Sequence, residues 1–211
     1  AFIKAALQSK NICKSGVRSV YRTVLIKTTC RINEVGMVNF ELAILDVIQS
    51  IRFPALDFVM KYVTHLGDAG LLFIVLTLLL LSFKKTRVYG AVCATALILD
   101  FLSVNLIIKP LVARERPFVL RPDIVLLVAR PLDYSFPSGH AAASFAFASA
   151  VGAYGKKYRP WAYALAVIIA FSRLYLYLHF ASDVLAGAAI GFLCGYAARL
   201  IWRRSLNKAK R

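Results

Sequence analysis

The residues of this sequence best suited to chemistry are polar groups that stand next to long apolar stretches. Lys109 and Arg116 follow one such stretch, Ser138, Gly139 and His140 open another, Arg173 lies near the end of the next, and His179 and Asp183 enclose the turn after it. An ionisable group in an apolar setting is costly to bury unless it has a partner or a function. We therefore take these residues as one candidate site.

Several of these residues are of the types that bind phosphate. Lys109, Arg116 and Arg173 supply positive charge, and the two guanidinium groups have planar forks that match phosphate oxygens. Ser138 and Gly139 stand where a helix is expected to begin, where serine is a favourable cap and glycine lets a ligand approach free backbone N–H groups. Together they predict an anion cradle.

The two histidines add the groups needed for phosphoryl transfer. Asp183 follows His179 by four residues, and a carboxylate hydrogen-bonded to one ring nitrogen would fix the tautomer and make the other nitrogen a better nucleophile. His140 can hold a proton near neutral pH and give it to a departing oxygen. The pattern predicts a nucleophile and a general acid beside the cradle.

The apolar stretches that must position these groups are long enough to indicate an integral membrane protein. Of the 211 residues, 60% are hydrophobic, and they gather into stretches at 69–83, 88–108, 139–154, 160–178 and 184–202. The first and third are short for a bilayer, so their ends must extend into flanking residues. Residues 38–66 mix charges with hydrophobes around Pro54, which predicts either two interfacial amphipathic helices or one imperfect sixth span. We expect an all-α bundle of five to six transmembrane helices, in one domain over residues 37–211.

The distribution of charge predicts how this bundle is oriented. Lys and Arg number 27 against 10 Asp and Glu, and membrane topology explains the excess better than a nucleic-acid partner does. The segments 84–87, 155–159 and 199–211 are basic and contain no acid, and alternating spans place all of them on one face. The positive-inside rule makes that face cytoplasmic, so the candidate site is expected on the extracytoplasmic face of a multi-pass protein of the cell membrane.

Residues 1–36 form a basic segment with no acid before Glu34. Its charges recur about once per helical turn, which is typical of an interfacial helix on anionic lipid, of a presequence-like segment or of a disordered tail. Met37 stands directly before the recognisable body and is an alternative start. The four cysteines lack paired or metal-ligand spacing and are expected to be packing residues.

Some polar and small residues near the spans receive no catalytic role. Gly187, Gly191 and Gly195 share one helical face, which predicts close approach of another helix. Arg114, Arg121 and Arg130 are expected to be anchors at the membrane surface, and Asp100 is left without a role.

Three motifs carry a resemblance to a known family. Residues 109–117, KPLVARERP, match K-x6-R-P; residues 137–140 are PSGH; and residues 172–183, SRLYLYLHFASD, match S-R-x5-H-x3-D. In this order the motifs resemble the signature of the type 2 phosphatidic acid phosphatase (PAP2) superfamily, over about residues 38–202.

The resemblance implies a role for each candidate residue. Lys109, Arg116 and Arg173 would hold the phosphate with the help of Ser138 and Gly139, His179 would attack phosphorus to form a phosphohistidine, Asp183 would orient His179, and His140 would protonate the leaving oxygen. No metal or other cofactor is expected, because the cations already neutralise the developing charge. The expected partners are the lipid bilayer and a membrane lipid substrate, and no nucleic acid.

The substrate expected first is undecaprenyl diphosphate, converted to undecaprenyl phosphate at the outer face of a bacterial membrane. A broader phosphatidylglycerophosphate or phosphatidic acid phosphatase is the alternative, and a lipid A phosphatase comes third. Two other classes stay open: a vanadium haloperoxidase, against which the predicted spans argue, and a binding or transport protein with a degenerate site, against which the intact His140, His179 and Asp183 argue.

Overall fold

The computed structural model describes residues 36–155 and 157–209, and every regular element within them is helical. Residues 36–50 are helical and are followed by α2 (Pro54–Leu66), the short η1 (Asp68–Gly70), α3 (Leu71–Ser82) and α4 (Arg87–Phe101). A π-helical turn, η2 (Leu102–Ile108), continues α4 into α5 (Lys109–Val112), and α6 (Pro117–Leu120) precedes a long loop. The chain then forms α7 (Gly139–Val151), α8 (Arg159–Tyr175), α9 (Ala181–Ile201) and α10 (Arg203–Ala209). The expected all-α fold is confirmed for this part of the chain.

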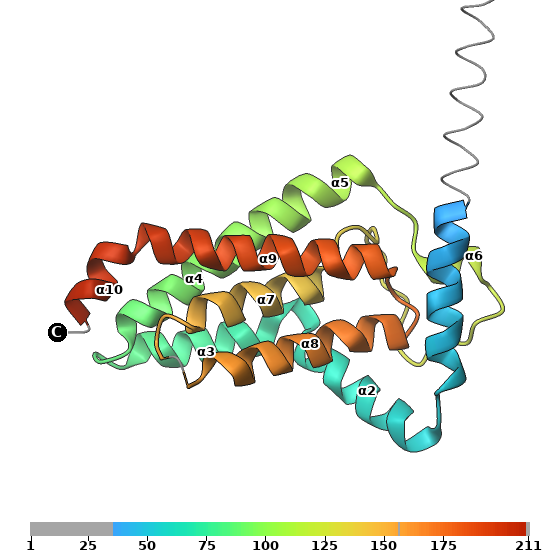
Figure 1. Cartoon of the computed structure of the whole chain (residues 1–211), viewed down its shortest axis with the longest axis horizontal. Coiled ribbons are helices and arrows are strands. Elements are labelled where there is room, and N and C mark those ends of the chain that lie inside the picture. The colour runs from blue at the N-terminus through green and yellow to red at the C-terminus, as the bar shows by residue number, and fades with distance from the viewer. Residues whose placement is uncertain (1–35, 156, 210–211) are drawn as a thin grey trace, which may run out of the picture. The chain divides into compact units, whose positions relative to one another are not determined.

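Helix α7 lies at the centre of the bundle. It packs against α4, α8 and α9, and Figure 1 shows these helices running side by side. Its buried face is rich in small residues such as Ala142 and Ala146, beside larger core side chains such as Val92 and Ile169 from α4 and α8. Small residues let helix backbones approach closely, which suits a bundle whose outer surface is apolar.

The glycine face of α9 contacts the backbone of α7, as its spacing predicts. A Cβ atom at Gly187, Gly191 or Gly195 would lie 2.4, 2.0 or 2.5 Å from a backbone oxygen of α7. No side chain fits at such distances, so these glycines set the separation of the two helices. The contact at Gly187 is with Ser138, so this packing also fixes the start of α7.

We expect Gly191→Ala to destabilise the protein by about 2 kcal/mol, because the added methyl forces α7 and α9 apart. Thermal unfolding in detergent measures the change. Gly152→Ala is the matched control, since a Cβ there has its nearest neighbour at 3.4 Å. Equal unfolding temperatures for the two variants would contradict the close packing of α7 and α9.

All of the apolar stretches expected to be spans are helical, but their lengths differ. By length and composition, two described segments are able to cross a membrane, Arg87–Leu120 and Ala181–Ile201, and the bent pair of α2 and α3 would make a third. Helix α7 has 13 residues, which reach only about 20 Å. The structure therefore supports two to three candidate spans, and the expected count of five to six is not confirmed.

The amphipathic region at 38–66 contains two helices, with Pro54 as the first residue of the second. Proline is favoured at that position because its missing N–H has no helical partner there. The region therefore contains two helices separated by residues 51–53. The basic N-terminal segment predicted at 1–36 falls, apart from its last residue, outside the described residues.

Candidate active site

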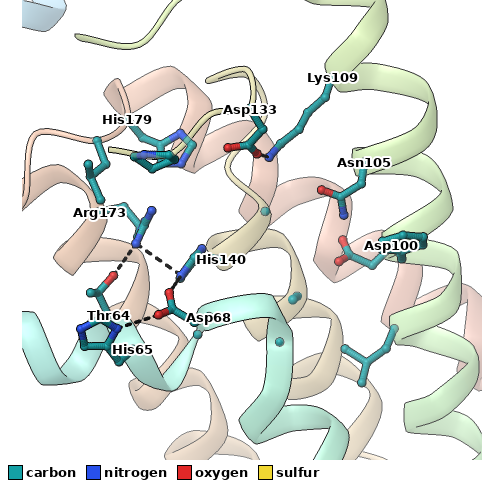
Figure 2. A pocket seen from close by; sticks show the side chains of 18 of the residues that line it. Thr64, His65, Asp68, Asp100, Asn105, Lys109, Asp133, His140, Arg173 and His179 are labelled. Carbon is teal, nitrogen blue, oxygen red and sulfur yellow. Dashed lines mark hydrogen bonds and ion pairs between the residues drawn. The ribbon is translucent and has the colours of Figure 1, made fainter. Parts of the chain in front are cut away.

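Lys109 and Arg116 lie at the two ends of a short segment, residues 109–116, which follows η2 and precedes α6. Lys109 begins α5 directly after the π-helical turn, and Arg116 is the last extended residue before Pro117 starts α6. Both side chains are buried. The Lys109 ammonium donates to Oδ2 of Asp133, a residue of the loop between α6 and α7. Figure 2 shows this pair in the upper part of the pocket, with Asp133 level with His179 and above His140 and Asp68.

The Arg116 guanidinium is only 4% exposed and lies between this loop and His179. Its Nη2 donates to Oδ1 of Asp133 at 2.7 Å, and its Nε donates to the backbone oxygen of the same residue at 2.9 Å. Its Nη1 donates to the backbone oxygen of Leu178 at 2.9 Å and lies 3.0 Å from Nε2 of His179. Arg116 thus ties the loop to the turn that carries the expected nucleophile.

Ser138, Gly139 and His140 form the expected start of α7. Ser138 is the extended cap residue, and its Oγ accepts a hydrogen bond from the backbone N–H of Ala141 at 3.5 Å. A Cβ at Gly139 would lie 3.8 Å from both Nζ of Lys109 and Oδ1 of Asn105. The position of Gly139 therefore opens onto the space beside the Lys109 ammonium, where a phosphate is expected.

Arg173 comes to the same space from the last turn of α8. The guanidinium is 3% exposed, and its Nη1 donates to Thr64 of α2 and lies 3.3 Å from Nε2 of His140. Its Nε has no hydrogen-bond partner among the described residues. This leaves a buried donor available to a ligand.

The turn between α8 and α9 holds His179 in place through an unusual backbone conformation. Tyr177 is buried and has a φ of 59°, a left-handed value that is rare and strained for a bulky residue. Its hydroxyl donates to Asp46 at 2.9 Å, and the backbone oxygen of the neighbouring Tyr175 accepts from Gln49 at 2.8 Å. Strained residues of this kind persist where the surroundings fix them, often at functional sites.

His179 is enclosed by protein and cations. Its side chain is 1% exposed. Burial, and then the positive charges of Arg116, Arg173 and Lys109, hold the pKa of His179 well below its usual range. The imidazole is therefore neutral at physiological pH, which is the form a nucleophile requires.

The predicted hydrogen bond between Asp183 and His179 is not formed. The Nδ1 of His179 lies 3.6 Å from Oδ2 of Asp183, which is too long for a hydrogen bond. The Asp183 carboxylate instead accepts from Ser135 at 2.5 Å, from the Phe180 backbone N–H at 2.9 Å and from Arg114 at 2.5 Å. Caps of this kind fix the start of α9, so Asp183 is adjacent to His179 but held by other partners.

Arg114 does more than the surface anchoring expected of it. Its guanidinium also binds Ser182 at 2.7 Å and lies over the Phe180 ring at 4.0 Å. It therefore braces the first turn of α9, which carries Asp183. Arg121 instead pairs with Asp46 and Asp123, and Arg130 lies over the Phe118 ring.

His140 has a carboxylate partner that the sequence did not reveal. Its Nε2 lies 2.9 Å from Oδ1 of Asp68, and Oδ2 of Asp68 lies 2.6 Å from Nδ1 of His65 (Figure 2). The hydrogen bonds from His140 and His65 lower the pKa of Asp68 to about 2, although burial opposes them. A Cβ at Gly67 would lie 2.5 Å from Cδ2 of His140, so only glycine lets this segment come so close.

These side chains surround one cavity of about 650 Å³. Its polar wall includes the expected site residues Lys109, Arg116, Gly139, His140, Arg173 and His179, together with Thr64, Asp68, Asn105 and Asp133. Its apolar wall includes Ile74 of α3 and Ile98, Phe101 and Leu102 of α4 and η2, all of which are also exposed on the outside of the bundle. The cavity therefore joins a cationic end to an apolar rim.

Asp100, a buried acid of α4, also lines this cavity. Its Oδ1 has no hydrogen-bond partner in the part of the chain that the structure describes. No three His, Cys, Asp or Glu side chains of that part are grouped as a metal site.

The structure thus brings the sequence-predicted site residues together, with Ser138 and Asp183 held just behind the cavity wall. Asp68, Asp133, Thr64 and Arg114 were missed. The pairing of Gly67 with Asp68 at a helix break, and the single acid in the last part of the 121–138 loop, were the available signals.

Comparison with known proteins identifies the family. The model of the PAP2 superfamily matches residues 88–206. An undecaprenyl-diphosphatase of Sulfolobus acidocaldarius is 29% identical over 156 residues, which cover 73% of this chain and 74% of that protein. Phosphatidylglycerophosphatase B of Bacillus subtilis is 30% identical over 157 residues, which cover 68% of this chain and 73% of that protein.

Two solved structures support the same family. The crystal structure of a PAP2-type phosphatidylglycerolphosphate phosphatase from Bacillus subtilis matches with a TM-score of 0.67 and 27% identity, over 80% of this chain and 87% of that one. The structure of Aquifex aeolicus LpxE matches with a TM-score of 0.65 and 30% identity, over 74% of this chain and 93% of that one. With its three motifs gathered around one cavity, the chain belongs to the PAP2 superfamily of phosphatases.

Proposed function

We propose that this phosphatase removes the terminal phosphate of a membrane lipid, and that undecaprenyl diphosphate, cleaved to undecaprenyl phosphate, is its first substrate. The observation that carries the proposal is the cavity itself, which places Lys109, Arg116 and Arg173 around His179 at one end and apolar side chains at the other. A phosphate fits the first environment and a hydrocarbon tail fits the second.

The reaction begins with attack by Nε2 of His179 on phosphorus. This nitrogen lies 3.0 Å from Nη1 of Arg116, and a phosphate that takes over this contact of Arg116 would place its phosphorus near the freed lone pair. The N–P bond forms as the bond to the leaving oxygen breaks, and the three cations neutralise the charge that gathers on the other oxygens. The product of this step is the released lipid and a phosphohistidine.

His140 supplies the proton for the leaving oxygen. Its Nε2 lies between Asp68 at 2.9 Å and Arg173 at 3.3 Å, next to the phosphate-binding groups. The hydrogen bond with Asp68 fixes the orientation of the ring, as a general acid requires. Water then attacks the phosphohistidine, His140 takes its proton, and inorganic phosphate leaves as the N–P bond breaks. We assign Asp183, with Arg114 and Ser135, to holding the turn that positions His179.

The lipid tail is proposed to reach the cavity between α3 and α4. Ile74, Ile98 and Phe101 both line the cavity and lie exposed on the outside of the bundle. A side opening of this kind lets a lipid enter from the bilayer without leaving it. An isoprenoid tail and acyl chains both suit such an opening, so phosphatidylglycerophosphate and phosphatidic acid are the second candidates and lipid A the third.

We propose that α3, α4, α7, α8 and α9 all cross the membrane, with the C-terminus in the cytoplasm and the cavity toward the outside. The acid-free basic segments support this orientation. A phosphatase reporter fused after residue 211 should be inactive and a fluorescent reporter bright. The reverse result would move the site to the inner leaflet and remove the reason for preferring undecaprenyl diphosphate.

Phosphate release by the detergent-purified protein tests the function. Undecaprenyl diphosphate, phosphatidylglycerophosphate, phosphatidic acid and lipid A are compared with and without EDTA. We expect release that EDTA does not reduce, because the cavity supplies its own cations. Release should be fastest with undecaprenyl diphosphate. Loss of activity in EDTA that added Mg²⁺ restores would overturn the metal-independent mechanism.

A further inference from the structure

Arg116 has no spare donor for a substrate. A guanidinium has five N–H groups. Nε faces the backbone oxygen of Asp133, Nη1 faces the Leu178 oxygen and His179, and Nη2 faces Oδ1 of Asp133 and, at 3.5 Å, the Tyr134 oxygen. A phosphate oxygen can therefore bind Arg116 only by replacing one of these acceptors. The backbone oxygens belong to the segments that build the site, and the contact with His179 supplies only one Nη1 donor. The Asp133 carboxylate is a side chain that can rotate away and free Nη2.

The Asp133 carboxylate also binds Lys109, the other cation of the K-x6-R-P motif. One oxygen of Asp133 accepts from Lys109 and the other accepts from Arg116 at 2.7 Å. Two oxygens bridging two cations is also the way one edge of a phosphate would bind them. The Asp133 side chain is 52% exposed, so rotation into solvent opens no hole in the core.

Asp133 carries its full negative charge at physiological pH. Burial raises the pKa of Asp133, but the hydrogen bond from Lys109 and the charges of Lys109 and Arg116 outweigh it and lower the pKa to about 2. A competing anion must therefore attract the two cations more strongly than one carboxylate does. A phosphate monoester or terminal diphosphate carries about two charges near neutral pH, whereas a phosphodiester carries one.

We propose that Asp133 is a specificity-determining residue that admits dianionic terminal phosphates and keeps the singly charged phosphodiester lipids of the surrounding membrane off Lys109 and Arg116. This rests on the proposed function, because it concerns the same site. A dianion gains more from the cations than the carboxylate loses, while a diester of the same charge as Asp133 gains nothing by the exchange. The residue thus keeps abundant membrane lipids from occupying the cradle as inhibitors.

Binding to the full-length protein in detergent tests the proposal without turnover. Isothermal titration compares inorganic phosphate with a short-chain phosphatidylglycerol, for the wild type and for Asp133→Asn, which keeps the shape but removes the charge. We expect the variant to bind phosphate about tenfold more tightly and to bind the diester measurably, because the competitor is weakened. The wild type should bind phosphate and show no diester binding.

Two further variants make the result specific. Asp133→Glu keeps the charge and should discriminate as the wild type does. Asp123→Asn removes a carboxylate that pairs with Arg121 in the same loop, and it should leave both affinities unchanged. Unchanged or weaker phosphate binding by Asp133→Asn, or diester binding by the wild type, would overturn the proposal. If binding behaves as expected but no lipid is hydrolysed by the wild type, the proposed function fails and this inference stands.

Discussion

Replacing His179 by alanine is expected to reduce phosphate release by about 10⁴-fold or more. The variant loses the nitrogen that attacks phosphorus, so the chemical step itself is removed. The loss should appear in kcat with every lipid, because the same step precedes each product. Initial rates of phosphate release, measured in detergent on the best lipid, give the ratio.

The control for this variant is its ability to bind. Lys109, Arg116, Arg173 and Asp133 keep their charges in His179→Ala, so inorganic phosphate should still bind with an affinity close to that of the wild type. A variant that binds phosphate but does not turn over lipid separates lost chemistry from lost folding. Activity within tenfold of the wild type would show that His179 is not the nucleophile.

Replacing His140 by alanine is expected to slow hydrolysis of phosphatidic acid by about 10²- to 10⁴-fold, the usual contribution of a general acid. The effect should depend on the leaving group. A lipid alcohol needs a proton as it departs, whereas p-nitrophenolate is stable without one. The ratio of wild-type to variant rate should therefore be large for phosphatidic acid and close to one order of magnitude or less for p-nitrophenyl phosphate.

Asp68 provides a graded version of the same test. Asp68→Asn removes the charge that favours the protonated ring, and we expect about a tenfold loss with phosphatidic acid and little loss with p-nitrophenyl phosphate. Asp68→Glu should recover part of the rate. Equal losses on both substrates in His140→Ala and in Asp68→Asn would mean that these residues only maintain the structure of the site.

The helices and their contacts were largely predictable from sequence because the relevant signals are local. Long apolar stretches become helices, and glycines four residues apart on α9 lie on one face that can only meet a close neighbour. The predicted spans were expected to bring residues from α5, α7, α8 and the turn before α9 to one side of the bundle, and in the structure these segments line one cavity. The apolar pattern does not give the length of each helix, and α7 has only 13 residues.

The partners of the carboxylates were not predictable, because they depend on how separate segments meet. Asp68 reaches His140 from a break between α2 and α3, and Asp133 reaches Lys109 and Arg116 from an irregular loop. For Asp183 the sequence predicted a hydrogen-bond partner that the structure does not show. Its spacing from His179 predicted a hydrogen bond, but the competing donors of Arg114, Ser135 and Phe180 draw the carboxylate away to 3.6 Å.

The most direct test of the account is to trap the covalent intermediate on His179. The purified protein is mixed rapidly with a lipid labelled in its terminal phosphate, quenched in alkali, which preserves phosphohistidine, and digested for mass spectrometry. The account predicts one labelled peptide carrying phosphate on His179, labile to acid and absent from His179→Ala. Rapid turnover with no labelled protein at any time, or phosphate on another residue, would contradict it.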